Sequence, residues 1–207
     1  MMVRDRFCVL HLITGLSDGG AEGVLTRLVL NSDDFEHVVI SLTSEGKYGK
    51  LLKQKGVTLY FLNLDKGINL ISQLLWLLRT VKFHGPDLIQ SWLYHADFLT
   101  SVLKIFNMKV PVIWNVRTSR MYWSHGNILL NTLVYINASL SHVVPKRVVF
   151  NSYNASAYHI GLGYNREKSF IIPNGFVSPC EKGVFKSSPP APILKSEAVS
   201  LGIRFGM

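Results

Sequence analysis

The chain has 207 residues, enough for one domain with a sizeable core. Hydrophobic residues make up 48% of it and charged residues 17%, a composition that excludes an intrinsically disordered protein. The net charge of +9 favours an anionic partner, such as a nucleic acid, an acidic membrane surface or a phosphorylated small molecule.

Apolar runs of strand length alternate with segments of helical periodicity. The predicted strands are residues 7–13, 37–42, 57–62, 87–93, 112–116, 147–150 and 168–172. Helices are expected after the first glycines and over residues 46–55, 69–82, 96–106, 127–140 and 155–161. This alternation predicts an α/β fold with a doubly wound, mostly parallel sheet and helices on both faces. Ligands of such folds bind beyond the carboxyl ends of the strands.

The composition changes near the end of the chain. Residues 1–176 are expected to form the α/β domain, whereas residues 177–207 are rich in proline and serine and read as a linker entering a short helix. Cys8 and Cys180 form no disulfide framework, which favours a reducing compartment such as the cytoplasm. No apolar run reaches the roughly 20 residues that a membrane-spanning helix requires.

A glycine-rich loop joins the first strand to the first helix. Such a junction presents unpaired backbone N–H groups at the positive end of a helix, which suits a phosphate. Gly19 and Gly20 have no Cβ and can adopt positive φ, so a ligand can approach the main chain closely. The loop lacks the spacing of a dinucleotide fingerprint and the lysine of a Walker loop. The alternative is that the glycines only form a tight turn.

The segment after the fourth strand carries a histidine and a carboxylate two residues apart. His95 can share a proton or donate a hydrogen bond to a sugar hydroxyl or phosphate. The alternative is a histidine at a helix start that bonds to the backbone. Asp97 is either a substrate ligand or a carboxylate in a first helical turn that complements the dipole.

Arg117 follows the fifth strand at the same edge of the expected sheet. Its guanidinium can bind a phosphate bidentately, and the alternative is a solvated surface charge. The sequence has no D-x-D motif, no zinc-ligand spacing and no G-x-S-x-G elbow, so we expect neither a metal cofactor nor Ser/His/Asp hydrolysis. The basic residues are scattered and no nucleic-acid-binding motif occurs, so we expect no nucleic-acid partner.

Five motifs together resemble the amino-terminal half of glycosyltransferase family 4, retaining enzymes of GT-B fold. They occur in family order as GGAE (19–22), PDLIQSWLYHADFL (86–99), VIWNVRTS (112–119), VVFNS (148–152) and GYNREKSFIIPNGF (163–176). The resemblance implies a Rossmann-like domain, one half of a GT-B fold, and a nucleotide-diphospho-sugar as donor substrate rather than a cofactor.

The resemblance also implies roles for particular residues. Gly19 and Gly20 would approach the donor diphosphate, and His95 would face the transferred sugar as the catalytic residue. Tyr94, Asp97, Arg117 and Asn174 would bind donor or acceptor.

The family's carboxy-terminal half, with its basic pair and E-x7-E element, has no counterpart in this sequence. The late acids Glu181 and Glu197 do not have that spacing, and Val177 stands where many relatives have aspartate. We therefore expect the acceptor-binding half of a transferase, acting on a lipid-linked or polysaccharide acceptor, with a separate chain as one source of the other half. The alternative is a truncated, non-catalytic remnant or binding module.

Membrane contact is a separate hypothesis. On a helical wheel of residues 69–83, Trp76 and Phe83 fall within the polar stripe, a pattern typical of a helix at a lipid headgroup interface. The lysines of the preceding helix would add attraction to anionic lipid on the inner face of the plasma membrane: Lys47, Lys50, Lys53 and Lys55. The alternative is a solvated basic helix, with Trp76 covering a neighbouring loop.

Overall fold

A computed structural model of the chain describes residues 6–67, 69–106, 109–118 and 128–174. The chain divides into two compact units, Met1–Pro173 and Asn174–Met207. All the helices and strands given below belong to the first unit, and Asn174 is the described residue of the second. The predicted domain division after residue 176 stays a prediction.

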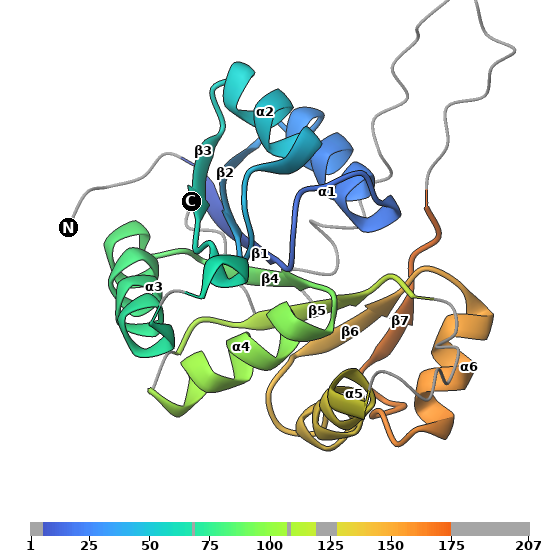
Figure 1. Cartoon of the computed structure of the whole chain (residues 1–207). Coiled ribbons are helices and arrows are strands. Elements are labelled where there is room, and N and C mark those ends of the chain that lie inside the picture. Colours follow the sequence, from blue (N-terminus) through green and yellow to red (C-terminus); the bar gives the residue numbers. More distant parts are fainter. Residues whose placement is uncertain (1–5, 68, 107–108, 119–127, 175–207) are drawn as a thin grey trace, which may run out of the picture. The chain divides into compact units, whose positions relative to one another are not determined.

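Within the described residues, seven parallel strands form one sheet in the order β3-β2-β1-β4-β5-β6-β7 (Figure 1). The strands are β1 (Phe7–Ile13), β2 (Phe35–Ser41), β3 (Thr58–Phe61), β4 (Leu88–Trp92), β5 (Val112–Val116), β6 (Arg147–Phe150) and β7 (Ser169–Ile171). The order reverses between β1 and β4, so the sheet is doubly wound. The predicted Rossmann-like α/β fold is confirmed.

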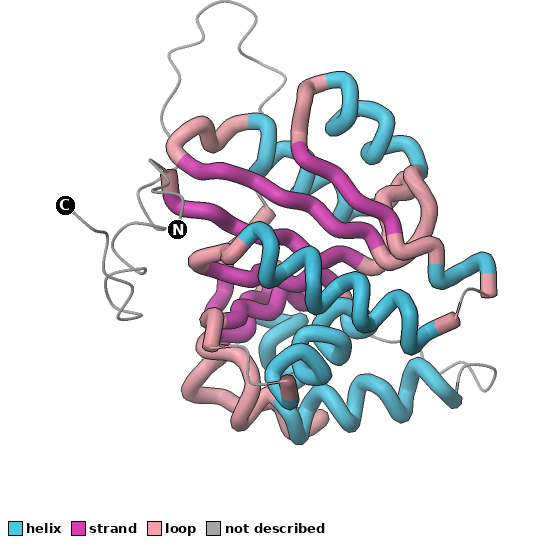
Figure 2. The backbone as a smooth tube through the Cα atoms, turned by 90° about the vertical axis from the view of Figure 1, so that its left-hand side faces the viewer, coloured by secondary structure: helices cyan, strands magenta, loops and turns pink. Residues whose placement is uncertain are grey.

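Helices cover both faces of the sheet (Figure 2). They are α1 (Gly20–Leu30), α2 (Gly46–Gln54), α3 (Leu70–His84), α4 (Tyr94–Ile105), α5 (Ile128–Leu140) and α6 (Tyr153–Gly161), with a short 3₁₀ turn η1 (Leu64–Lys66) before α3. Buried residues of α1 and α2 pack in one core cluster, and those of α3, α4, α5 and α6 pack in another. Successive β1 residues point to opposite faces, so Leu12 enters the second cluster and Ile13 the first.

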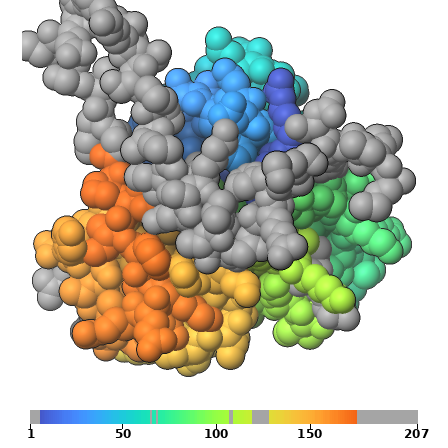
Figure 3. Space-filling view, turned by 180° about the vertical axis from the view of Figure 1, so that it is seen from behind, coloured from blue at the N-terminus to red at the C-terminus, as the bar shows by residue number. Residues whose placement is uncertain are grey.

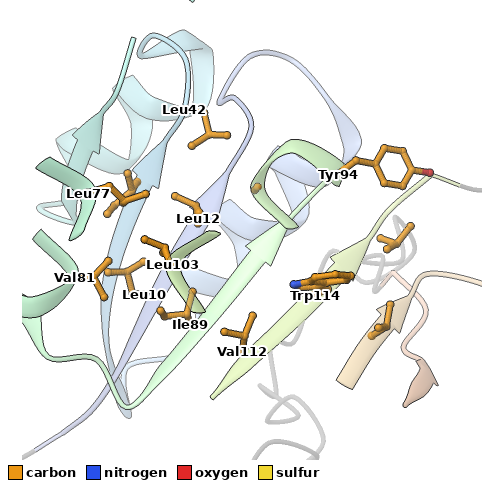
Figure 4. Close-up of a cluster of buried hydrophobic side chains, with 14 of the residues drawn as sticks. Leu10, Leu12, Leu42, Leu77, Val81, Ile89, Tyr94, Leu103, Val112 and Trp114 are labelled. Atoms are coloured by element: carbon orange, nitrogen blue, oxygen red, sulfur yellow. The ribbon is translucent and has the colours of Figure 1, made fainter. Parts of the chain in front are cut away.

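The second cluster anchors α4 (Figure 4). Trp114 of β5 is fully buried, and its Nε1 donates a hydrogen bond to Oγ1 of Thr100 on α4 at 2.9 Å. Leu103, one turn further along α4, lies in the same cluster as Ile89 and Val112. Full burial of one such apolar side chain contributes about 1.5–3 kcal/mol, so α4 is held firmly on β4 and β5.

Several element boundaries differ from the sequence prediction by two residues, among them the starts of α4 and α6. α4 begins at Tyr94, two residues before the predicted start, because Leu93 has a φ of 72° and turns the chain directly from β4 into the helix. α6 begins at Tyr153 because Ser152 caps it, accepting a hydrogen bond from the Ala155 N–H at 3.1 Å. Tyr94 and His95 therefore lie on a helix and not in a loop.

Candidate functional site

The carboxyl ends of β1, β4 and β5 lie side by side. Ile13 pairs with Trp92, and Trp92 pairs with Asn115. Past the paired residues, the Thr14 N–H donates to the Trp92 oxygen at 3.4 Å, and the Leu93 N–H donates to the Asn115 oxygen at 3.1 Å. The glycine loop, the start of α4 and the segment after β5 therefore leave the sheet at neighbouring positions on one edge.

The glycine loop does not use positive φ. Gly19 is the N-cap of α1 with an extended φ of −142°, and Gly20 is not among the glycines with positive φ, so neither residue uses the conformational freedom that glycine allows. Apart from its chain neighbours and the backbone of α1, a Cβ added at Gly20 would meet no atom of the described residues within 4 Å. The open space beside the Gly20 main chain is compatible with close approach of a ligand to the first turn of α1.

The position of the loop is set by the start of α2. The Tyr48 N–H donates to the Leu16 oxygen at 2.9 Å. Gly46 has a φ of 59°, and a Cβ there would collide with the Leu16 backbone. Asp18 and Lys47 add an ion pair of 2.8 Å between two exposed side chains. The glycine loop is therefore fixed by main-chain contacts, to which the exposed ion pair adds little.

A carboxylate already lies at the N-terminus of α1. The side chain of Glu22 lies so close to Gly19 that it would collide with any Cβ at that position. A carboxylate in the first turn stabilises a helix by about 0.3–1 kcal/mol. The same charge opposes a second anion, so a diphosphate at this helix end requires the Glu22 side chain to turn away.

The start of α4 is held in a strained conformation. A positive φ is unfavourable for a bulky residue such as Leu93, and such outliers persist only where the surroundings fix them. Here the Asp97 N–H donates to the Leu93 oxygen at 3.0 Å, and Nδ2 of Asn137 donates to the Tyr94 oxygen at 2.9 Å. These bonds fix the backbone at the start of α4, and with it the direction in which the His95 side chain projects from the helix.

His95 is exposed at this helix start. Among the described residues its ring has no hydrogen-bond partner, so the alternative of a backbone-bonded histidine is not observed. Loss of part of its hydration against the protein lowers the pKa of His95, which favours the neutral imidazole at pH 7. A neutral, accessible imidazole can donate from one nitrogen and accept at the other.

Tyr94 and Asp97 point into the protein. The Tyr94 hydroxyl lies 2.7 Å from Nε2 of His159, whose Nδ1 donates to the Ala155 oxygen, so Nε2 is the acceptor. Asp97 is fully buried and accepts from the Ser91 hydroxyl at 2.6 Å. Burial raises the pKa of Asp97 well above its ordinary value. Both side chains support α4 in this conformation, and their contact with substrate stays a prediction.

Arg117 is half-buried, which rules out the alternative of a solvated surface charge. Its Nη2 donates to Oδ1 of Asn115 at 3.3 Å and its Nη1 to the Ile172 oxygen at 3.4 Å. The guanidinium lies 5.2 Å from the centre of the Trp92 ring, a cation–π contact. Burial lowers the pKa of Arg117 to about 10, so the group is still charged at neutral pH.

A chain of buried and half-buried hydrogen bonds runs on from Trp92. Its Nε1 donates to Nδ1 of His11 at 3.4 Å, so Nε2 of His11 carries the proton and donates to Nδ1 of His37 at 3.0 Å. Nε2 of His37 then donates to the main-chain oxygen of Ser32 at 3.2 Å. Burial lowers the pKa of both histidines.

Sequence reasoning missed Asn137 and His159, which fix α4 from two other helices. The signal for Asn137 was an amide within an otherwise apolar helical segment, whereas His159 belongs to no motif. Asn174 belongs to the second unit, and its role in substrate binding stays a prediction.

An open hollow is found elsewhere, lined by residues of α6 and its neighbours: Tyr153, Ser156, Ala157, Ile160, Gly161, Arg166 and Ile171. Figure 3 shows the surface of α6 and β7 in orange, with that of α1 in blue.

In the described part of the chain, no group of three or more His, Cys, Asp or Glu residues could hold a metal ion. None of the helices described combines the length and the hydrophobicity that a bilayer span requires.

Solved structures share this fold. Alr3699/HepE from Anabaena, in complex with UDP, matches with a TM-score of 0.67 and 19% identity over 95% of this chain and 50% of its own. The lipopolysaccharide outer core galactosyltransferase WaaB matches with a TM-score of 0.58 and 10% identity, over 82% of this chain and 46% of its own. UDP-N-acetylglucosamine 2-epimerase from Rickettsia bellii matches with a TM-score of 0.56 and 14% identity, over 82% of this chain and 45% of its own. These likenesses show the fold alone, and the chain spans about half the length of these proteins.

The fold class is therefore that of one half of a GT-B protein. A search of the curated proteins found no significant match. The model of Glycosyltransferase Family 4 matches residues 18–177, most of the chain. The chain belongs to Glycosyltransferase Family 4.

Proposed function

We propose that the chain is the acceptor-binding half of a retaining glycosyltransferase, which moves a sugar from a nucleotide-diphospho-sugar to an acceptor. One observation carries this proposal: the glycine loop, the start of α4 with His95 and the Arg117 segment follow three adjacent parallel strands. Family membership supports the same reaction class. HepE has been solved with UDP and with UDP-glucose, which supports a nucleotide-sugar donor.

The first turn of α1 would receive the donor diphosphate. Its N–H groups and helix dipole favour an anion, and the space beside Gly20 admits one. In the reaction the bond from the sugar's anomeric carbon to the diphosphate breaks, and the diphosphate leaves with the bonding electrons. An acceptor hydroxyl forms the new bond to that carbon and releases its proton. N–H groups that already point at the position of that negative charge stabilise the transition state, because they need not reorient during the reaction.

His95 would orient the transferred sugar by hydrogen bonds from a neutral ring. The fixed start of α4 supports this role, because a positioning group contributes most when its own direction is set. Arg117 would remain charged and lie along the same edge, where a guanidinium can bind phosphate or an acidic acceptor. Asn174 and the buried pair Tyr94 and Asp97 are proposed as lesser contributors to substrate binding.

The second candidate is a binding module that transfers nothing by itself. The observation in its favour is that the chain spans about half the length of the structures it matches. In GT-B transferases the donor lies between two domains, so a separate chain carrying the other half would be the partner that restores transfer. We propose no nucleic-acid partner and no metal cofactor.

The acceptor is proposed to be lipid-linked or a polysaccharide, which would place the protein in cell-surface glycan synthesis, in the cytoplasm at the inner face of the plasma membrane. The decisive experiment titrates the 207-residue chain with UDP-sugars, alone and with a candidate carboxy-terminal half. Release of UDP only with both halves present supports the transferase. Saturable acceptor binding with no UDP release in either arm supports the binding module.

A further inference from the structure

The open hollow beside α6 has a volume of about 500 Å³. It lies where α6 flanks β7, the edge strand of the described sheet (Figure 1). Its lining extends from Tyr153, the first residue of α6, to Gly161, the last, and includes Arg166 and Ile171 beyond the helix. The hollow therefore follows α6 over roughly 12 Å, and its volume is in the range of about 300–1,000 Å³ that small-molecule sites have.

The hollow begins next to Arg117. Nδ2 of Asn151 donates to the main-chain oxygen of Arg117 at 3.2 Å, and Tyr153 follows Asn151 by two residues. Nη1 of Arg117 donates to the main-chain oxygen of Ile172 at 3.4 Å, and the preceding residue, Ile171, lines the hollow. A ligand held at the carboxyl edge of the sheet can therefore continue past Arg117 and along α6.

The lining combines apolar surface with a few polar groups. Tyr153 is 79% exposed, so its ring offers a flat apolar surface with a hydroxyl at the tip. Ile160 and Ile171 add apolar surface, Ser156 adds a hydroxyl and Arg166 adds a guanidinium. A sugar ring matches this combination, because it has apolar C–H faces and a rim of hydroxyl groups.

The charge around the hollow favours an acidic ligand. Residues 128–174 contain four lysines and arginines and a single acid, Glu167, and none of the lining residues is acidic. Arg166 is exposed, and among the described residues no carboxylate lies within ion-pair distance of it. Burial and the nearby charge of Lys146 lower the pKa of Lys168, so cations are already crowded at this end of the molecule.

We propose that the hollow binds an acidic oligosaccharide, with a sugar ring against Tyr153 and a carboxylate held by Arg166. A guanidinium forms paired hydrogen bonds with a carboxylate, and the apolar lining packs against the sugar ring. Arg117, at the near end of the hollow, binds a second acidic group of the same chain. This inference rests on the proposed function, and it selects a glycan of several acidic sugars from the acceptor classes given there.

Calorimetric titration of the full 207-residue chain tests the proposal with three probes: tetragalacturonate, maltotetraose and tetraglutamate. Tetragalacturonate has both the sugar and the carboxylates, whereas maltotetraose lacks the charge and tetraglutamate lacks the sugar. We expect tetragalacturonate to bind at least about tenfold more tightly than either of the other probes, with an affinity that falls as salt is added.

Three variants test the hollow itself: Tyr153→Ala, Arg166→Gln and Ala157→Phe, of which the last fills the hollow without changing its charge. Each should lower the affinity for tetragalacturonate at least about fivefold, because a ring contact, a charge-assisted hydrogen bond or the space for the ligand is lost. Thermal unfolding should be unchanged, since all three positions are exposed. The matched controls, Tyr135→Ala on α5 and Arg79→Gln on α3, should change the affinity by less than about twofold.

The proposal is overturned if tetragalacturonate does not bind to the wild-type chain, or if the three folded variants bind it as the wild type does. Equal affinity for maltotetraose or for tetraglutamate also overturns it. Failure of the proposed function gives a different result. A chain that binds tetragalacturonate in the hollow, but releases no UDP when combined with a complementary half, has the acidic-glycan site and is not a transferase. Release of UDP without tetragalacturonate binding overturns the site alone.

Discussion

Asn137 donates a hydrogen bond from its side chain to the main-chain oxygen of Tyr94 at 2.9 Å, although the two residues are 43 positions apart. The amide is fully buried. It ties α5 to the first residue of α4, next to the strained Leu93 and the exposed His95. The geometry of the His95 side chain therefore depends on a residue of another helix.

Asn137→Ala should lower the free energy of unfolding by about 1–3 kcal/mol, because the buried Tyr94 oxygen loses its side-chain donor. Urea unfolding measures this change. Ser139→Ala on the exposed side of the same helix is the control and should stay within about 0.5 kcal/mol of the wild type. Equal stability of the two variants would show that the Asn137 bond does not hold α4.

Gly20→Ala should separate ligand binding from folding. The position has ordinary helical geometry with open space around it, so alanine should keep or raise stability, by about 0.4–1 kcal/mol. The added methyl group would occupy the space through which a diphosphate approaches α1. Pyrophosphate affinity measured by calorimetry should therefore fall at least about tenfold, which corresponds to about 1.4 kcal/mol of binding free energy.

Gly161→Ala at the end of α6 is the matched control for that substitution. It also has open space around it and no positive φ. It should tolerate alanine equally well and leave pyrophosphate affinity unchanged. If Gly20→Ala binds pyrophosphate as the wild type does, the glycines only form a turn.

Glu22→Gln should strengthen pyrophosphate binding about two- to fivefold, because the first turn of α1 then carries no competing negative charge. The same calorimetric titration measures this effect, with Glu167→Gln as a control outside the helix. Unchanged or weaker binding by Glu22→Gln would indicate that the carboxylate does not compete for the helix end.

The His11–His37 pair predicts loss of stability in mild acid. Burial lowers the pKa of both rings below the ordinary 6.5, so the unfolded chain binds more protons than the folded one. The stabilisation is complete above pH 6.5 and is lost as the pH falls below it, by up to about 1.4 kcal/mol per pH unit for each histidine. Urea unfolding at pH 7.5, 6.5 and 5.5 measures this slope.

Asp97 acts in the opposite direction. Burial raises its pKa, so its contribution to stability declines as the pH rises above the ordinary 3.8. Asp97→Asn removes that term and should make the rise of stability with pH steeper. A chain as stable at pH 5.5 as at 7.5, in both the wild type and this variant, would contradict the assigned state of the histidine pair.

The sequence predicted the sheet well because its signals are local. Strands buried on both faces are short apolar runs, as in β1 and β5, and each intervening helix shows its own periodicity. Because the carboxyl ends of parallel strands lie at the same edge of a sheet, the predicted strands also placed the glycine loop, His95 and Arg117 on one edge. Positive φ, which the glycines could adopt, is used at neither Gly19 nor Gly20, because Gly19 is an extended N-cap and Gly20 is the first residue of α1.

The support beneath the site could not be read from the sequence. The contacts of Tyr94 with Asn137 and His159 join residues 43 and 65 positions apart, and no local pattern reports such pairs. The positive φ of Leu93 is imposed by tertiary contacts and not by its own preference. No local pattern indicates that the Glu22 side chain folds back on Gly19, and this contact is seen only in the structure.

The most direct test of the proposed function is the turnover of His95→Ala when the chain is combined with a complementary donor-binding half. If His95 orients the transferred sugar, release of UDP from a UDP-sugar should fall by about a hundredfold or more. The melting temperature should stay unchanged, because the ring is exposed. Turnover equal to that of the wild type would contradict the account.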